Sequence, residues 1–228
     1  QKRTGRRKMK FRAVFLDIDD TLFDFRKSSF EALVTAFAEI GVSFTEADMP
    51  HYEVYNNRMW EMFERGEIEK ERFRLYFAER GIEADTAAFN RKYLYELAEG
   101  VNFMPHCAEL LRVLHGRVKV FILTNGDTYA QERRIEKSGF APYFDGVFIS
   151  EQLGCKKPEK AFYDKVFALV GEEYRGCTLM VGDSLSSDMQ GGRNASIPTC
   201  FYGKREKADA RCDYVIEDLL ELPPLLGI

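Results

Sequence analysis

Short apolar runs alternate with amphipathic stretches along most of this chain. The apolar runs are typical of buried strands and cover residues 11–16, 118–123, 146–150 and 179–181. The amphipathic stretches predict helices over roughly 105–114, 128–138 and 159–170, each followed by a glycine stop signal at Gly116, Gly139 and Gly171. Two further short strands, expected at sheet edges, cover 197–201 and 214–216. This alternation predicts an α/β fold with a doubly wound parallel sheet.

Residues 24–103 interrupt the alternation. They contain no comparable strand pattern and are rich in Glu, Arg, Phe and Ala at helical spacing. Four helices are predicted, near residues 27–40, 45–65, 70–80 and 85–98. An insert of about 80 residues is long enough to bury a small core of its own. We therefore expect a helical cap domain, 24–103, inserted into a core domain formed by 11–23 and 104–228.

The first ten residues differ from the rest because they are basic and almost devoid of apolar side chains. A signal peptide would continue into an apolar stretch and a cleavage site, whereas here the next apolar residues begin the first strand. We interpret residues 1–10 as a disordered tail or as added residues before a natural start at Met9. An arm that binds polyanions is the alternative.

Bulk composition agrees with a soluble enzyme. Hydrophobic residues make up 45% of the 228, enough for a substantial core, and no apolar run approaches the length that spans a membrane. The net charge of −4 argues against a surface that coats nucleic acid. The five scattered cysteines are typical of reduced thiols. We expect a cytoplasmic monomer or weak homodimer with no nucleic-acid or membrane partner.

Carboxylates follow two of the predicted strands. Asp17 and Asp19 follow the first strand, and Asp183 and Asp188 follow the strand at 179–181. Carboxylates crowded at strand ends repel one another unless a cation holds them, and hard oxygen ligands suit Mg²⁺. A carboxylate oxygen can then attack phosphorus, because the metal neutralises charge on both partners. Taken alone, the first pair has a solvated acidic turn as its alternative, and the second pair has a helix N-cap.

Two further segments match what a phosphate site needs. The strand at 118–123 runs into Thr124, Asn125 and Gly126, where a hydroxyl, an amide and a permissive glycine can surround a phosphate oxygen. Lys157, with Lys156 as its rival, precedes a proline expected at the first position of the next helix. Each of the four segments alone has a structural explanation. Together they follow one another in this order, and three of them lie at strand ends, so we expect them to form one site.

The order and residue types resemble the haloacid dehalogenase-like phosphatase superfamily. Its four motifs correspond here to residues 17–21 (Asp-Ile-Asp-Asp-Thr), 124–126 (Thr-Asn-Gly), 157–158 (Lys-Pro), and 182–184 (Gly-Asp-Ser) with Asp188. Within the superfamily the chain is most similar to bacterial pyrimidine 5′-nucleotidases with a helical cap. That closer resemblance is carried by residues 17–23, 52–60, 149–154, 157–162, 180–183 and 187–195.

The resemblance implies a Rossmann-like core and a covalent mechanism. Asp17 is implied as the nucleophile that forms an aspartyl-phosphate. Asp19 is implied as the acid that protonates the leaving alkoxide and then as the base that takes a proton from water. Thr124 and Asn125 would hold phosphoryl oxygens, and Lys157 would offset the charge of nucleophile and phosphate.

The implied cofactor is Mg²⁺. By resemblance, its ligands are Asp17, the backbone carbonyl of Asp19, and Asp183. Asp188 is expected to be a second carboxylate or an outer-shell anchor. Asp20 is expected to shape the turn rather than take part in the chemistry.

Specificity is expected to lie in the cap. Nucleobases stack on aromatic rings, and Trp60, the single Trp of the chain, lies in the cap segment that carries the resemblance. Asn56 is a candidate hydrogen-bond partner for a base edge. Packing inside the cap is the alternative for these two and for the neighbouring aromatic residues Tyr52, Tyr55, Phe63 and Phe103.

The expected function is hydrolysis of a small phosphate ester, namely a (deoxy)pyrimidine nucleoside monophosphate. A phosphatase or mutase for a sugar phosphate with a similar cap is the nearest alternative. A dehalogenase is disfavoured, since Asp19 supplies an acid–base group that carbon–halogen cleavage does not need. A non-catalytic phosphate sensor on the same fold would be expected to lack a motif carboxylate, and none is missing.

Overall fold

A six-stranded parallel sheet forms the centre of the computed structural model, which describes residues 11–67 and 72–228. The strand order is β3-β2-β1-β4-β5-β6, and each neighbouring pair is parallel. The strands are β1 (Ala13–Leu16), β2 (Lys119–Thr124), β3 (Gly146–Ile149), β4 (Thr178–Gly182), β5 (Thr199–Tyr202) and β6 (Tyr214–Ile216). The prediction of a doubly wound parallel sheet is confirmed. The prediction that both C-terminal strands are edge strands is wrong for β5, which lies between β4 and β6.

The helices follow the predicted pattern closely. They are α1 (Phe25–Glu39), α2 (Met49–Glu64), α3 (Arg72–Arg80), α4 (Thr86–Glu99), α5 (Cys107–Leu114), α6 (Thr128–Ser138), α7 (Ser150–Leu153), α8 (Lys160–Val170), α9 (Gln190–Asn194) and α10 (Leu222–Leu226). Gly139 ends α6 at a φ of 71°, a left-handed conformation that glycine adopts without strain. Pro158 does not begin α8 as expected. It follows a cis peptide bond after Lys157, and Glu159 is the residue that precedes the helix.

The chain forms two compact units. Among the described residues, the first contains 11–23, 103–125 and 140–228, and the second contains 24–67, 72–102 and 126–139. The second unit therefore includes α6, which lies within the predicted core range 104–228. Glu99, the last residue of α4, accepts hydrogen bonds from Arg133 and Lys137 of α6, at 3.2 and 2.5 Å. The expected tail, residues 1–10, lies outside the described residues, as does the expected start of the third cap helix at residue 70.

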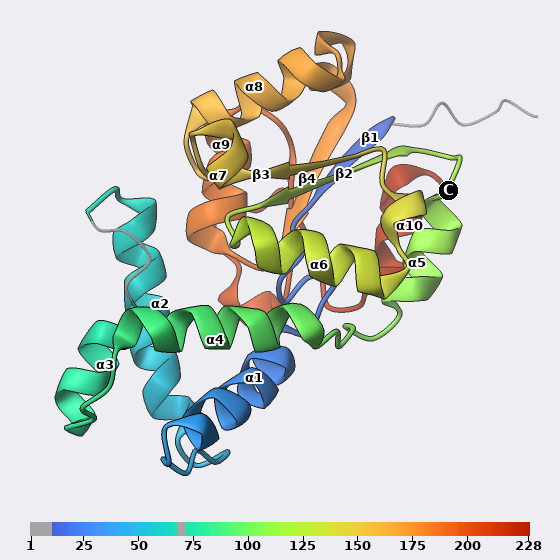
Figure 1. The fold of residues 1–228 in the computed structure, drawn as a ribbon. Helices are drawn as coiled ribbons and strands as arrows, with labels where there is room; N and C mark the ends of the chain where they lie inside the picture. The colour runs from blue at the N-terminus through green and yellow to red at the C-terminus, as the bar shows by residue number, and fades with distance from the viewer. Residues whose placement is uncertain (1–10, 68–71) are drawn as a thin grey trace, which may run out of the picture. The chain divides into compact units, whose positions relative to one another are not determined.

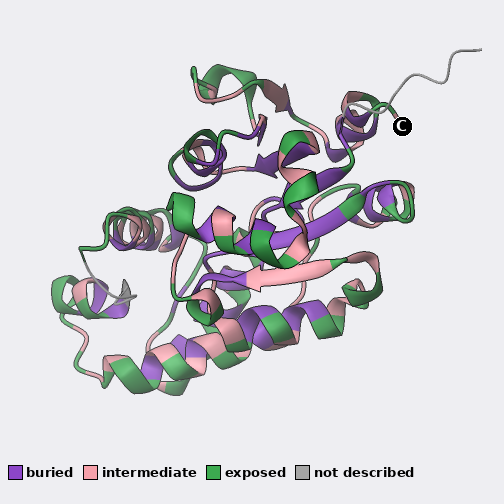
Figure 2. Ribbon diagram, turned by 90° about the horizontal axis from the view of Figure 1, so that it is seen from above, coloured by how far each residue is buried: buried purple, intermediate pink, exposed green. Residues whose placement is uncertain are grey.

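The first unit is built around the sheet. Phe15 of β1 contacts Phe167 of α8 at a ring distance of 4.9 Å, and Phe121 and Met180 belong to the same buried cluster. Helix α8 runs along one side of the strands (Figure 1). Strands β1 and β4 are buried throughout, whereas the edge strand β3 is half-buried over most of its length (Figure 2). Continuous apolar strands are typical of a parallel sheet covered on both faces.

The second unit has its own aromatic core. Phe37 of α1 stacks on Phe44 at 4.8 Å and contacts Phe89 of α4 at 4.7 Å. Phe73 of α3 packs against Phe89 at 4.7 Å, and Tyr52 of α2 stacks on Phe73. Large buried rings contribute much apolar area per residue, so this small unit can bury a core of its own.

The sheet topology indicates where a ligand would bind. Strand β1 lies between β2 and β4, and the strand order reverses at this point of the sheet. In open α/β sheets, ligands bind outside the carboxyl ends of the strands at such a switch point. Residues that follow Leu16 and Gly182 therefore lie in the expected position for chemistry.

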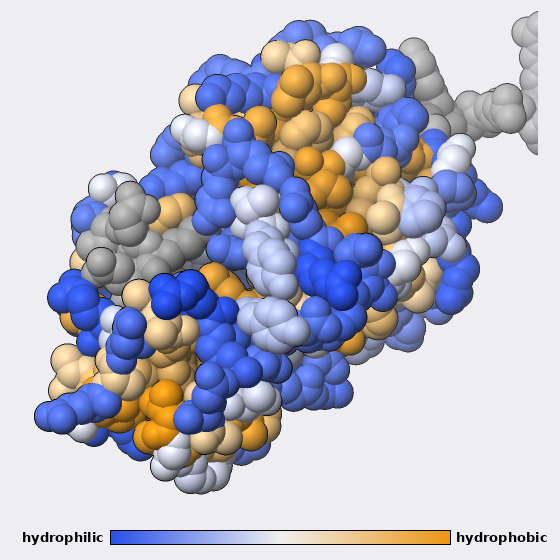
Figure 3. Space-filling view, in the orientation of Figure 1, coloured by the Kyte–Doolittle hydropathy of each residue, from blue (hydrophilic) through white to orange (hydrophobic). Residues whose placement is uncertain are grey.

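The surface of the molecule is mostly polar on the face shown in Figure 3, with hydrophobic residues gathered in separate patches. Within 11–67 and 72–228, no helix has both the length and the apolar composition that crossing a bilayer requires.

Candidate active site

Three carboxylates meet at the switch point of the sheet. Asp17 follows β1, and its N–H donates to the carbonyl of Val181 in β4 at 3.0 Å. This bond continues the pairing of the two strands one residue beyond β1. One carboxylate oxygen from each of Asp17, Asp183 and Asp188 lies within 4.8 Å of the others. The structure thus brings together three of the four predicted acidic side chains.

Lys157 is buried in the middle of this cluster. Its Nζ donates to Asp17 Oδ1 at 2.5 Å, to Asp188 Oδ1 at 2.7 Å, and to the carbonyl of Leu123 at 2.9 Å. The ammonium group has three N–H bonds, so all of them are used. The side chain is only 2% exposed. Lys157, rather than its neighbour Lys156, is therefore the lysine that contacts the predicted nucleophile.

Asn125 holds the main chain of Lys157 in place. Its Oδ1 accepts the N–H of Lys157 at 3.0 Å, and its Nδ2 donates to the carbonyl of Lys157 at 2.9 Å. The Nδ2 also lies 3.4 Å from Ser187 Oγ. The sequence suggested a phosphate contact for Asn125, but these bonds already occupy its amide group. Positioning of the lysine loop is a role that sequence reasoning missed, because nothing in the sequence relates residue 125 to residue 157.

A tight turn after β4 places Asp188. The Oδ2 of Asp188 accepts the N–H of Ser184 at 3.1 Å, and Ser184 Oγ accepts the N–H of Ser187 at 3.1 Å. Residues Leu185–Met189 form a single π-helical turn, a geometry often found at functional sites. A Cβ at position 182 would lie 2.2 Å from Asp188 Oδ2, so this position requires glycine.

The turn after β1 orients the remaining polar residues. Asp20 has a φ of 55° and its N–H donates to the carbonyl of Phe23 at 2.7 Å. Aspartate is one of the few residues besides glycine that adopts this conformation readily, which agrees with a turn-shaping role. Thr21 Oγ1 donates to Asp183 Oδ1 at 3.4 Å. Asp19 is half-exposed, and its carboxylate is not part of the acidic cluster.

The electrostatics of the cluster show an excess of negative charge. Burial is the largest cause that raises the pKa of Asp17, to about 8; Lys157 opposes this shift, and the carboxylates of Asp188 and Asp19 add to it. Burial and the charges of Asp17 and Asp188 raise the pKa of Asp183 well above its usual value. Burial lowers the pKa of Lys157, but the carboxylates of Asp17 and Asp188 outweigh it and raise that pKa overall.

These residues fit a divalent cation. Three carboxylates face one ammonium group, and a hard divalent ion that prefers oxygen ligands would offset the remaining negative charge. Both oxygens of Asp188 already accept hydrogen bonds, one from Lys157 and one from Ser184. Asp188 is therefore suited to an outer shell, and Asp17 and Asp183 are the better-placed ligands.

Thr124 and the two cap candidates complete the set of predicted residues. Thr124 ends β2 and is buried. Asn56 and Trp60 lie on α2, in the second unit. Asn56 is 6% exposed, and its Oδ1 accepts no hydrogen bond in the described part of the chain. Trp60 is half-buried and contacts Phe63 edge to face at 5.6 Å. Their role in base recognition stays a prediction.

The other cap aromatic residues separate into different environments. Tyr52 is 1% exposed and stacks inside the core of the second unit, so it is a packing residue. Phe103 belongs to the first unit, where it contacts Phe23 at 5.5 Å and Phe140 at 4.9 Å.

Comparison with known proteins agrees with this site. A family model described as haloacid dehalogenase-like hydrolase matches residues 11–196. The pyrimidine 5′-nucleotidase YjjG of Escherichia coli is 33% identical, over 96% of this chain and 99% of its own length. The pyrimidine 5′-nucleotidase PynA of Streptococcus pneumoniae is 36% identical, over 85% and 84%. The crystal structure of YfnB from Bacillus subtilis bound to magnesium has 31% identity and a TM-score of 0.89, covering 96% of this chain and 99% of that one.

A parallel sheet of order 3-2-1-4-5-6 with a lysine-linked carboxylate cluster at its switch point defines a Rossmann-like α/β protein, and the matching family model places it among hydrolases. The chain belongs to the haloacid dehalogenase-like hydrolases. The predicted family and fold class are thereby confirmed.

Proposed function

We propose that this protein is a Mg²⁺-dependent phosphomonoesterase that acts through an aspartyl-phosphate, with a (deoxy)pyrimidine nucleoside 5′-monophosphate as substrate. The observation that supports the chemistry best is the contact between Lys157 Nζ and Asp17 Oδ1 inside a buried cluster of carboxylates. A buried carboxylate is a poor nucleophile while protonated, and Lys157 favours its ionised form.

Asp17, Asp183 and the main-chain carbonyl of Asp19 would hold the metal. The bound ion supplies positive charge that lowers the repulsion between a carboxylate nucleophile and an anionic phosphate. Lys157 provides a second, permanent positive charge at the same point. Thr124, at the end of β2, would donate its hydroxyl to a phosphoryl oxygen.

The reaction then proceeds in two displacements. Asp17 attacks phosphorus, the bond from phosphorus to the ester oxygen breaks, and Asp19 donates its proton to the leaving alkoxide. In the second step Asp19 accepts a proton from water, the water oxygen attacks phosphorus, and the bond to Asp17 breaks. Phosphate is released, and both aspartates return to their starting states. The half-exposed position of Asp19 leaves its carboxyl accessible to both the leaving group and water.

Two observations favour a nucleotide as the substrate. The relatives from Escherichia coli and Streptococcus pneumoniae are named pyrimidine 5′-nucleotidases. The buried Oδ1 of Asn56 lacks a hydrogen-bond donor among the described residues, and a pyrimidine N–H can supply one. Trp60 would stack on the base.

A phosphate-release screen tests the proposal. The purified protein with Mg²⁺ would be given dUMP, dTMP, UMP, AMP, several sugar phosphates and an aryl phosphate. We expect the highest kcat/KM for the pyrimidine nucleotides. Preference for a sugar phosphate would refute the nucleotide substrate and leave the phosphatase chemistry standing. Absence of phosphate release from every ester would refute the phosphatase itself.

A further inference from the structure

A hollow lies at the amino ends of the strands, whereas the carboxylate cluster lies at their carboxyl ends. It has a volume of about 310 Å³, and all of its lining residues belong to the first unit. Arg12 precedes β1, Lys119 begins β2, and Asp145 precedes β3, so the hollow lies where these parallel strands start. Strand β2 has six residues, and a strand rises about 3.3 Å per residue, so the first and last residues of β2 are about 17 Å apart. A ligand here would not touch Asp17.

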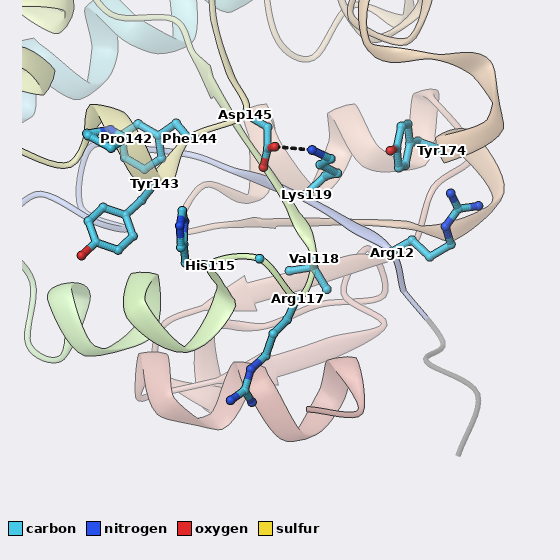
Figure 4. Close-up of a pocket in the computed structure, with 11 residues that line it drawn as sticks. Arg12, His115, Arg117, Val118, Lys119, Pro142, Tyr143, Phe144, Asp145 and Tyr174 are labelled. Carbon is cyan, nitrogen blue, oxygen red and sulfur yellow. Dashed lines mark hydrogen bonds and ion pairs between the residues drawn. The ribbon is translucent and has the colours of Figure 1, made fainter. Parts of the chain in front are cut away.

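Positive charge gathers at this hollow although the protein as a whole is negative. Arg12, Arg117 and Lys119 line it together with one carboxylate, Asp145, whereas the chain has a net charge of −4. Figure 4 shows Arg117 extending away from the centre, which leaves Arg12 and Lys119 as the cations available to a ligand in the hollow. Local positive charge of this kind attracts anions.

An ion pair already positions the lysine. Lys119 Nζ lies 2.6 Å from Asp145 Oδ1, and Asp145 Oδ2 accepts the N–H of Val120 at 2.9 Å. Asp145 therefore fixes Lys119 at the centre of the hollow while competing with any incoming anion for it (Figure 4). Arg12 carries its guanidinium group 5.3 Å from the centre of the Tyr174 ring. This contact holds the group without using its hydrogen-bond donors.

Aromatic rings line the other end of the hollow. His115 and Tyr143 form an edge-to-face pair with ring centres 5.2 Å apart, on the opposite side of the ion pair from Arg12 and Tyr174 (Figure 4). His115 is exposed and Tyr143 half-buried, so both are accessible to a ligand. Such rings are platforms on which a flat ring can stack.

We propose that this hollow is a second binding site, which takes an anion joined to a flat ring, the chemistry of a nucleoside monophosphate. The phosphate contacts Arg12 and Lys119, and the ring packs on His115 and Tyr143. The volume of the hollow lies at the lower end of the range of ligand pockets, which starts at about 300 Å³. A nucleoside monophosphate would occupy both ends of the hollow, whereas inorganic phosphate would leave the aromatic end empty. The site stands independently of the substrate proposed above.

The probe is the phosphonate isostere of UMP, which cannot be hydrolysed because a methylene group replaces its ester oxygen. Backbone NMR spectra of the isotope-labelled protein with Mg²⁺ would be recorded during a titration. The amides of Gly116, Lys119 and Asp145 report on the hollow, and those of Asn125 and Gly182 report on the carboxylate cluster. We expect saturable shifts at Gly116, Lys119 and Asp145. If only the signals of Asn125 and Gly182 move, the proposal is wrong.

Variants of the cations and of the carboxylate in the hollow should change the affinity for the phosphonate in opposite directions. Lys119→Gln and Arg12→Gln should each weaken binding at the hollow about tenfold, the effect of losing one charge-assisted contact. Asp145→Asn should strengthen binding, because it releases Lys119 while an amide oxygen can still accept the Val120 N–H. Lys160→Gln, which removes an exposed lysine paired with Asp164 elsewhere on the unit, should change nothing. Equal affinity in Asp145→Asn and Lys119→Gln would overturn the phosphate contact.

The aromatic half is tested separately. Tyr143→Leu should weaken the phosphonate several-fold and leave the affinity for inorganic phosphate unchanged. Inorganic phosphate that binds the hollow as tightly as the phosphonate would show that no ring is recognised and would overturn the ligand class. Thermal melting of each variant shows that the unit stays folded, which the exposure of these side chains favours.

Discussion

Lys157 Nζ and Asp17 Oδ1 lie 2.5 Å apart, although the two residues are 140 positions apart in the chain. Both side chains are almost fully buried, and Asp188 shares the same ammonium group. The pair therefore balances charge where little of either side chain is solvated. Removing one partner leaves the other uncompensated, and this is the basis of the first prediction.

Lys157→Met should lower the free energy of unfolding of the metal-free protein by about 3–5 kcal/mol, as expected when one partner of a buried ion pair is removed. Lys160→Met is the matched control, because its pair with Asp164 is exposed and should cost at most about 1 kcal/mol. Urea denaturation in EDTA measures both values. Equal losses in the two variants would show that the buried pair has no special role.

Variants of Asp17 and Asp19 should lose activity in ways that depend differently on the leaving group of the substrate. Asp17→Asn should abolish turnover of every ester, because an amide cannot form the acyl-phosphate. Asp19→Ala should lose far more activity on an alkyl phosphate than on an aryl phosphate, whose leaving group needs no proton. The comparison uses kcat on both substrates. Because water attacks phosphorus, single turnover in ¹⁸O water should label the released phosphate and leave the Asp17 carboxylate unlabelled, and label in the carboxylate would contradict attack at phosphorus. Acid quenching during turnover should trap phosphate on Asp17, and its absence there by mass spectrometry would contradict the covalent route.

Mg²⁺ binding should strengthen as the pH rises. Without a cation, burial raises the pKa of Asp17 from 3.8 to about 8 and also raises that of Asp183, so protons must leave these groups when the ion binds. The free energy of unfolding of the metal-free protein should also fall as the pH rises from 4 toward 8. In this range Asp17 and Asp183 bind more protons in the folded state than in the unfolded state. Calorimetric titration at pH 6 and pH 8.5 measures the affinity. An affinity independent of pH would contradict the prediction.

Gly182→Ala should disturb the site through Asp188. The new methyl group would lie 2.2 Å from Asp188 Oδ2, so the carboxylate must move away from Lys157. We expect kcat to fall at least about tenfold, the effect of losing one charge-assisted hydrogen bond. Gly176→Ala is the control, since a Cβ there meets no atom within 4 Å. A Gly182→Ala enzyme with normal kcat would show that the position of Asp188 is unimportant.

Trp60 should distinguish substrates by what lies beyond the phosphate. Trp60→Ala should lower kcat/KM for dUMP by about 1–3 kcal/mol, the contribution of one stacked base, with little change for an aryl phosphate. Tyr95→Ala, at an exposed aromatic residue of α4 in the same unit, is the control. If both substrates lose equally in Trp60→Ala, the side chain supports the packing of its unit and does not read the base.

Local patterns predicted the elements well, because apolar spacing and glycine stop signals act over a few residues. The bounds of α6 follow from its amphipathic pattern and from Gly139, and the four carboxylates were found from their positions after strands. Contacts between distant segments were not predictable in the same way. The two hydrogen bonds of Asn125 to the main chain of Lys157 depend on how β2 and the lysine loop meet in space, as does the placement of α6 beside α4.

The two hydrogen bonds between Asn125 and the main chain of residue 157 have a consequence for engineering. Because both bonds go to main-chain atoms, the course of the loop is fixed whichever side chain stands there. The charge that faces Asp17 comes from the side chain alone. The main-chain position of residue 157 and the charge of its side chain can therefore be changed independently. A shorter side chain at this position would leave a cavity beside Asp17 with the shape of the missing lysine side chain. A small amine of matching size could enter that space from solution and act in place of the missing ammonium group.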